Sequence, residues 1–299
     1  MTESDPPVLR TRGQPAAVAA VRTMLAGRPP HAVLLVGPPA TGKTTLAADL
    51  AAGLLCEEPD RSRRPCRACR GCRLVDAGTH PDLHRLRPEG AGRQIVIGDP
   101  LDPAPGTVRW LVGALALTSV EGGARVAVVE EAVRLNEDAQ NALLKTLEEP
   151  PPGVTIVLCV DDEALLLPTV RSRCARVRLG PAGVREIEGL LGELGLADAP
   201  TAARLARLAG GRPGLAVTLA RSPDAAIDRA AIVRGLLDAL GAGRPERLAT
   251  VRELASRAAG IVRALDAGLA GPGEEAAPRA KGRGRGAAKA TAAVAEPEP

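Results

Sequence analysis

The first residues that could carry chemistry form a glycine-rich segment near the N-terminus. It reads Gly37-Pro38-Pro39-Ala40-Thr41-Gly42-Lys43-Thr44 and fits the phosphate-binding pattern G-x-x-x-x-G-K-[ST], although a glycine-rich turn can fit that pattern by chance. In the pattern, N–H groups of the loop and of the following helix point at phosphate oxygens. Lys43 would reach the β- and γ-phosphates and Thr44 would bind magnesium. The predicted nucleotide-binding residues are Gly37, Gly42, Lys43, Thr44 and Thr45.

A pair of acids, Glu130 and Glu131, directly follows the apolar run 126–129. In phosphoryl transfer, one acid can hold the magnesium shell and another can orient the attacking water. We therefore expect Glu130 to bind magnesium and Glu131 to activate water, because the phosphate-binding pattern lies upstream at a workable distance. Without that pattern, two acids at the end of a strand would be ordinary surface residues.

Four cysteines form a third group, with the spacing C-x9-C-x2-C-x2-C. Four thiolates suit a tetrahedral Zn2+ ion and leave no open position for water, so the zinc would be structural. The alternative is a loop of unbound thiols, which would be an oxidation liability. The predicted ligands are Cys56, Cys66, Cys69 and Cys72.

Continuous apolar runs indicate the elements that must position these groups. Runs of strand length without polar alternation are typical of strands buried on both faces of a parallel sheet. Helix-compatible stretches separate them, and Asn136 can cap the helix that follows the acid pair. Strands that alternate with helices predict an α/β fold. The predicted strands are 32–36, 95–97, 126–129, 154–160 and 176–179.

Composition changes along the 299 residues predict further units. The chain is 45% hydrophobic and 25% charged, with a formal net charge of +4, which is ordinary for a globular protein. No strand candidate follows Gly180, and the last segment has too few apolar residues to fold. We expect a nucleotide-binding α/β domain at 1–180 with a zinc module at about 56–79, a small helical domain at 181–221, a short helical region at 222–270 and a disordered tail at 271–299.

Composition also excludes some functions. The chain has no Phe or Tyr and a single Trp, so it cannot bind single strands by stacking bases on Phe or Tyr. No run reaches the roughly 18 apolar residues of a membrane span, and the acidic start lacks the apolar region of a secretory signal. We therefore expect a cytoplasmic protein without membrane partners, whose cysteines are thiols or metal ligands.

In combination, these segments resemble the bacterial clamp-loader branch of the AAA+ ATPases over about residues 9–220. The four-cysteine module after the phosphate-loop helix is a distinctive feature of that branch. The resemblance implies an AAA+ P-loop domain, a helical lid at 181–221 and a shortened collar-like region at 222–270. Five further segments match the same branch and support the resemblance: 13–14, 28–32, 80–82, 135–151 and 167–174.

Within this family, the chain is most similar to the delta-prime type of DNA polymerase III subunit. Glu130, Val160 and Gly214 stand where motor subunits have the Walker B Asp, a polar sensor-one residue and the sensor-two arginine. The resemblance implies binding of ATP and Mg2+, weak or absent hydrolysis, and an arginine finger, Arg173, donated to a neighbouring subunit.

The resemblance also implies partners. These are gamma/tau and delta subunits in a hetero-oligomer and, through that complex, the sliding clamp and primed DNA. Two alternatives stay open: a catalytically active motor ATPase of the gamma/tau type, and a zinc-stapled nucleotide-binding adaptor outside replication.

Overall fold

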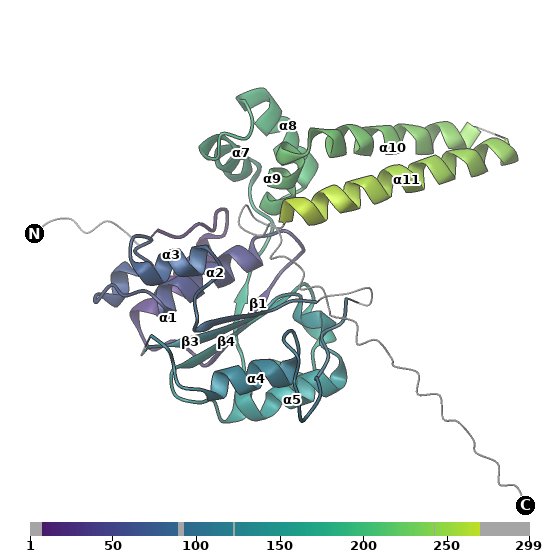
Figure 1. The fold of residues 1–299 in the computed structure, drawn as a ribbon. Helices are drawn as coiled ribbons and strands as arrows, with labels where there is room; N and C mark the ends of the chain where they lie inside the picture. Colours follow the sequence, from purple (N-terminus) through teal and green to yellow (C-terminus); the bar gives the residue numbers. More distant parts are fainter. Residues whose placement is uncertain (1–7, 89–92, 122, 242, 270–299) are drawn as a thin grey trace, which may run out of the picture.

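The computed structural model describes residues 8–88, 93–121, 123–241 and 243–269. At its centre lies a five-stranded sheet with the strand order β2-β3-β4-β1-β5 (Figure 1). Every neighbouring pair is parallel, which confirms the predicted α/β architecture with a parallel sheet. The strands are β1 (Ala32–Val36), β2 (Leu83–Leu86), β3 (Arg125–Val129), β4 (Val154–Val160) and β5 (Ala175–Arg178).

The second strand differs from the prediction. The prediction of a strand at 95–97 is wrong. Only Ile95 pairs there, in an isolated bridge to Leu135. The strand lies instead at Leu83–Leu86 and pairs with β3 alone, at the edge of the sheet. An edge strand tolerates polar side chains such as His84 and Arg85, so a search for unbroken apolar runs does not find it.

Helices cover both faces of the sheet (Figure 1). Val33 and Leu35 of β1 belong to the core on the first face, whereas Ala32 and Leu34 belong to the core on the second. This alternation explains why β1 is apolar at every position. The first face carries α1 (Pro15–Ala26), α2 (Lys43–Leu54) and α3 (Arg70–Asp76), and the second carries α4 (Val108–Ala116) and α5 (Glu137–Glu148).

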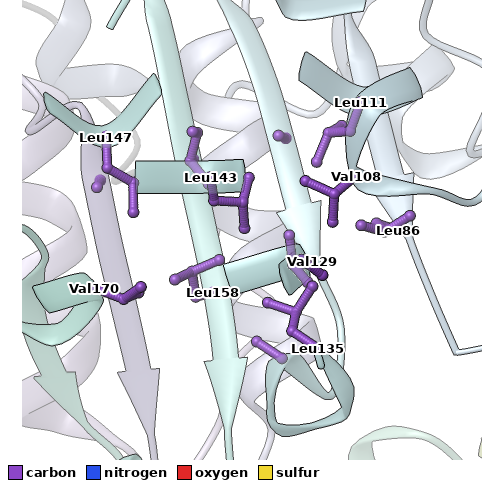
Figure 2. Close-up of a cluster of buried hydrophobic side chains, with 14 of the residues drawn as sticks. Leu86, Val108, Leu111, Val129, Leu135, Leu143, Leu147, Leu158 and Val170 are labelled. Atoms are coloured by element: carbon purple, nitrogen blue, oxygen red, sulfur yellow. The ribbon is translucent and has the colours of Figure 1, made fainter. Parts of the chain in front are cut away.

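The second core holds α5 against the sheet (Figure 2). Leu143 and Leu147 of α5 are fully buried in it together with Leu158 of β4. The helix begins at the predicted cap, where the side chain of Asn136 accepts the N–H of Ala139 at 2.9 Å. Short helical turns complete this part of the chain: η1 (Arg61–Arg63), η2 (Ala132–Arg134), η3 (Glu163–Leu165) and α6 (Pro168–Arg171).

Beyond β5, the described chain is helical. The helices α7 (Val184–Glu193), α8 (Ala199–Ala209) and α9 (Pro213–Arg221) share a separate hydrophobic core around Leu191 and Leu205. Two longer helices, α10 (Pro223–Gly241) and α11 (Arg244–Leu269), lie side by side and extend away from the sheet (Figure 1). Among the described residues, no helix combines the length and hydrophobicity of a membrane span. The tail predicted at 271–299 lies outside them.

Candidate functional site

The predicted phosphate-binding loop connects β1 to α2, at the carboxyl ends of the parallel strands, where open α/β sheets bind ligands. A Cβ at Gly37 would lie 2.3 Å from the carbonyl oxygen of Leu179, so no side chain fits. Gly42 has a φ of 101° and forms the N-cap of α2, a conformation that favours glycine. Thr44 and Thr45 follow, exposed in the first turn of α2.

Protein oxygens hold the ammonium of Lys43. Its Nζ donates to the carbonyl oxygens of Gly37 and Pro38, each at 2.8 Å, and to Oδ1 of Asp161 at 2.6 Å. An ammonium has three donors, so a phosphate must replace one of these acceptors. Asp161 follows β4, the neighbour of β1, and 48% of its side chain is exposed. Sequence analysis did not predict this contact, because only the pairing of β4 with β1 brings Asp161 to Lys43.

Glu130 lies at the end of β3 but is already paired with two arginines. Its Oε1 lies 2.7 Å from a terminal nitrogen of Arg85 and 3.0 Å from Nε of Arg87. Arg85 belongs to β2, on the side of β3 away from β1 and the phosphate loop. The side chain is only 15% exposed, and the two guanidinium groups balance its buried charge.

Glu131, the predicted water-activating acid, is paired as well. Its carboxylate lies 2.7 Å from Arg93 and 3.6 Å from Arg134. Its backbone is left-handed, with a φ of 49°, which is uncommon for a residue other than glycine, Asn or Asp. Its side chain is half-exposed. Three segments around this strand end therefore surround the two acids with guanidinium groups.

The helical region touches the phosphate loop at Gly214. The N–H of Gly214 donates to the carbonyl oxygen of Ala40 at 2.9 Å, and a Cβ at 214 would lie 3.0 Å from that oxygen. The predicted sensor-two position thus makes a close backbone contact instead of presenting a side chain. Between α9, the start of α2 and the segment 10–12 lies a cavity of about 260 Å3.

The four predicted zinc ligands come together. Their sulfur atoms all lie within 4.8 Å of one another, and Sγ of Cys56 lies 3.5 Å from that of Cys66 and 3.8 Å from that of Cys69. Sulfurs at about 2.3 Å from a tetrahedral zinc would be about 3.8 Å apart. Four thiols in this arrangement fit one zinc ion, and the fourth, Cys72, comes from the short helix α3.

Hydrogen bonds favour a thiolate in this cluster. Burial raises the pKa of the Cys66 thiol, but the N–H groups of Ala68 and Cys69 and the neighbouring thiols outweigh it and lower the pKa to about 7. Burial raises the pKa of Cys56 and Cys72. A metal ion would therefore have to displace protons from the two more buried thiols.

Arg173 lies just after α6, which packs on α5. Its guanidinium donates to the carbonyl oxygen of Thr169 at 2.8 Å and to Oε1 of Glu148 at 2.5 Å. A third of its side chain is exposed. Since α5 covers the face of the sheet opposite α2 (Figure 1), these partners hold Arg173 on a different side of the sheet from the phosphate-loop helix.

Comparison with known proteins places the chain among DNA polymerase III subunits. The family described as "DNA polymerase III, delta subunit" matches residues 13–182. DNA polymerase III subunit delta′ of Pseudomonas aeruginosa is 39% identical over 184 residues, 61% of this chain and 53% of that protein. The subunit delta′ of Escherichia coli K12 is 36% identical over 200 residues, 67% of this chain and 57% of that protein.

The chain thus spans little more than half the length of these two relatives. Among solved structures, the RuvB Holliday junction branch migration motor of Thermotoga maritima is similar, with a TM-score of 0.46 and 20% identity. That similarity covers 84% of this chain and 72% of the motor.

Proposed function

We infer a function from one premise: the chain belongs to the DNA polymerase III delta subunit family. We propose that it acts as a delta-prime-like clamp-loader subunit. In that role it would join gamma/tau and delta subunits in a hetero-oligomer and help to load the sliding clamp onto primed DNA. Both curated relatives described above are named subunit delta′, which supports this type over the motor type.

We propose that ATP binds at the phosphate loop. The support is local: Gly37 and Gly42 have the backbone geometry that the motif requires, and the first turn of α2 supplies N–H groups for phosphate oxygens. Lys43 would hold the phosphates, while Thr44 and Thr45 would lie beside them and the Thr44 hydroxyl would bind Mg2+. The cavity bounded by α9 would take the nucleoside, so helices α7 to α9 would act as its lid.

The proposal that hydrolysis is weak rests on the ion pairs of Glu130 with two arginines. Turnover needs an acid for the magnesium shell and a group that orients the attacking water. Glu130 is held by Arg85 and Arg87 on the β2 side of β3, whereas the ion pairs of Glu131 are exposed and too weak to keep it from orienting a water. An acid already neutralised by two guanidinium groups is a poor magnesium ligand. The chain would therefore bind ATP and hydrolyse it slowly.

We propose that Arg173 acts as an arginine finger on a neighbouring subunit. Its present partner, Glu148, is half-exposed, and an exposed ion pair of this kind contributes about 0 to 1 kcal/mol. An arginine finger can accelerate phosphoryl transfer by roughly three to five powers of ten. The ion pair with Glu148 is therefore too weak to prevent the guanidinium from moving to a neighbour's phosphate.

We propose that the cysteine cluster holds a structural zinc ion. Four thiolates would fill its coordination shell, so zinc would contribute to the stability of the module and would not act on a substrate.

The proposal is tested by reconstituting the complex with gamma/tau and delta subunits, the sliding clamp and primed DNA. Arg173→Ala should leave folding, zinc content and ATP binding of the isolated chain intact, and should sharply reduce clamp loading and DNA-stimulated ATP turnover by the complex. Arg178→Ala is the matched control, because Arg178 is also an exposed arginine paired with one glutamate.

Three results would contradict parts of the proposal. Equal loading by the Arg173→Ala and wild-type complexes, at saturating subunit concentrations, would remove the finger role. Rapid ATP turnover by the isolated chain would favour a motor subunit. Failure of the chain to enter the complex would favour an adaptor outside replication.

A further inference from the structure

A buried carboxylate connects the cysteine cluster to the N-terminal segment 10–12. Asp49 lies in α2, and its side chain is 1% exposed. It accepts the N–H of Arg10 at 3.0 Å, the N–H of Thr11 at 2.9 Å and the hydroxyl of Thr11 at 2.7 Å. Its charged partner is the guanidinium of Arg67. A buried charge is stable only when it is paired and hydrogen-bonded, so Asp49 depends on both groups of donors.

Arg67 comes from the cysteine cluster itself, between Cys66 and Cys69. Only 11% of its side chain is exposed, and it also donates to Asp76 at 2.8 Å. Its backbone is left-handed, with a φ of 58°. Such a conformation is unfavourable for a residue of this kind and persists only where its surroundings fix it. The cysteines on either side and the two aspartates provide those constraints.

The other end of this network reaches the candidate nucleotide cavity. Arg10, Thr11 and Arg12 line the cavity, opposite the start of α2 and α9. Arg10 also donates through its side chain to Asp76, at 2.8 Å, so both aspartates bind Arg10 as well as Arg67. One wall of the cavity is therefore attached to Asp49 and Asp76, and these two carboxylates are attached to Arg67.

We propose that Arg67 is a positioning residue that couples metal binding at the cysteine cluster to nucleotide binding in the cavity. This proposal rests on the nucleotide and zinc sites proposed above. With the cluster metal-bound, Arg67 neutralises Asp49, and Asp49 holds the N–H groups of segment 10–11 in place. If the cluster opens, Asp49 loses its charged partner, and the wall of the cavity loses its anchor.

The coupling must act in both directions, because a change in one binding equilibrium caused by the other is reciprocal. Zinc should tighten the binding of ATP, and ATP should raise the affinity of the cysteine cluster for zinc by the same factor. Couplings of this kind typically change an affinity by roughly 5- to 150-fold. We expect about tenfold, and we expect it to disappear when Arg67 is replaced.

The test measures Mg·ATP affinity by calorimetry on the full chain, zinc-loaded and after chelation. Wild type should lose about tenfold in affinity on zinc removal. Zinc-loaded Arg67→Ala should already show that loss, with one zinc still bound, and should lose little more on chelation. Arg70→Ala is the matched control: Arg70 also follows a cysteine of the cluster, but it pairs with the exposed Glu121, so it should behave like wild type.

A second measurement needs no variant. The affinity of the cluster for zinc, measured at equilibrium by competition with a chromophoric chelator, should be about tenfold higher with saturating ATP than without it. Equal zinc affinities of wild type with and without ATP, or ATP affinity unchanged by Arg67→Ala, would overturn the coupling while leaving the nucleotide site intact. A zinc-loaded wild type that binds no ATP would overturn the nucleotide site and the coupling together.

Discussion

If ATP binds at the phosphate loop as proposed, Asp161 should limit its affinity. Its Oδ1 lies 2.6 Å from Nζ of Lys43, the group that would receive a phosphate. A phosphate bound there would replace one of the three acceptors of Lys43, and a carboxylate that stays nearby would repel it. We therefore expect Asp161→Asn to tighten the binding of ATP. Asparagine keeps the shape of the side chain and an acceptor oxygen but removes the negative charge.

The size of the effect follows from the exposure of the two partners. Lys43 is 9% exposed at its side chain and Asp161 is 48% exposed. A hydrogen bond to a charged group contributes about 1.5 to 3 kcal/mol, whereas an exposed ion pair contributes about 0 to 1 kcal/mol. A half-exposed pair lies between these ranges. We expect about 1.4 kcal/mol, which is about a tenfold decrease in the dissociation constant.

The assay is calorimetric titration of the isolated chain with Mg·ATP. Lys43→Ala should abolish binding and so locates the signal at the loop. Asp162→Asn is the matched control, because it removes the adjacent charge while its side chain can still accept the N–H of Ala164, as Asp162 does at 2.9 Å. Asp162→Asn should change the dissociation constant of Mg·ATP by less than about twofold. Unchanged or weaker binding by Asp161→Asn, or an equal gain in Asp162→Asn, would refute the reasoning.

Two further predictions concern metal and pH. The protein purified without added metal should contain about one zinc per chain by elemental analysis, and a native protein without zinc whose cysteines all titrate freely would contradict the site. Burial raises the pKa of Asp82, but the N–H groups of Glu121 and Val120 and the hydroxyl of Ser119 outweigh it and hold the pKa below its ordinary range. The resulting stability is complete above the ordinary pKa of an aspartate and is lost as the pH falls through the lower, folded-state value. Asp82→Asn should therefore lower the free energy of unfolding, measured in urea at pH 7, by about 1 to 3 kcal/mol. The decrease should be smaller in acid, and an equal decrease at both pH values would contradict this role of Asp82.

Features that depend on short stretches of chain could be predicted from the sequence. The conformation of the loop 37–44 between β1 and α2 is specified by glycines at fixed spacing, because the backbone and the helix start within eight residues determine it. The four cysteines are brought together by turns within 17 residues, so their spacing was sufficient to predict a cluster. The buried strands β1, β3 and β4 could be found because a strand covered on both faces is apolar at every position.

Features that depend on neighbours distant in the chain were decided by the tertiary structure. The edge strand at Leu83–Leu86 carries polar residues and shows no apolar run, yet it places Arg85 beside Glu130. Asp161 meets Lys43 only because β4 pairs with β1. In a chain with 39 lysines and arginines, the identity of the one that neutralises a given acid depends on strand order and register. The sequence by itself determined which groups are present and which local motifs they form. The packing of the sheet and of the cysteine module determined which charges meet, because ion pairs form between side chains that are close in space, whatever their separation along the chain.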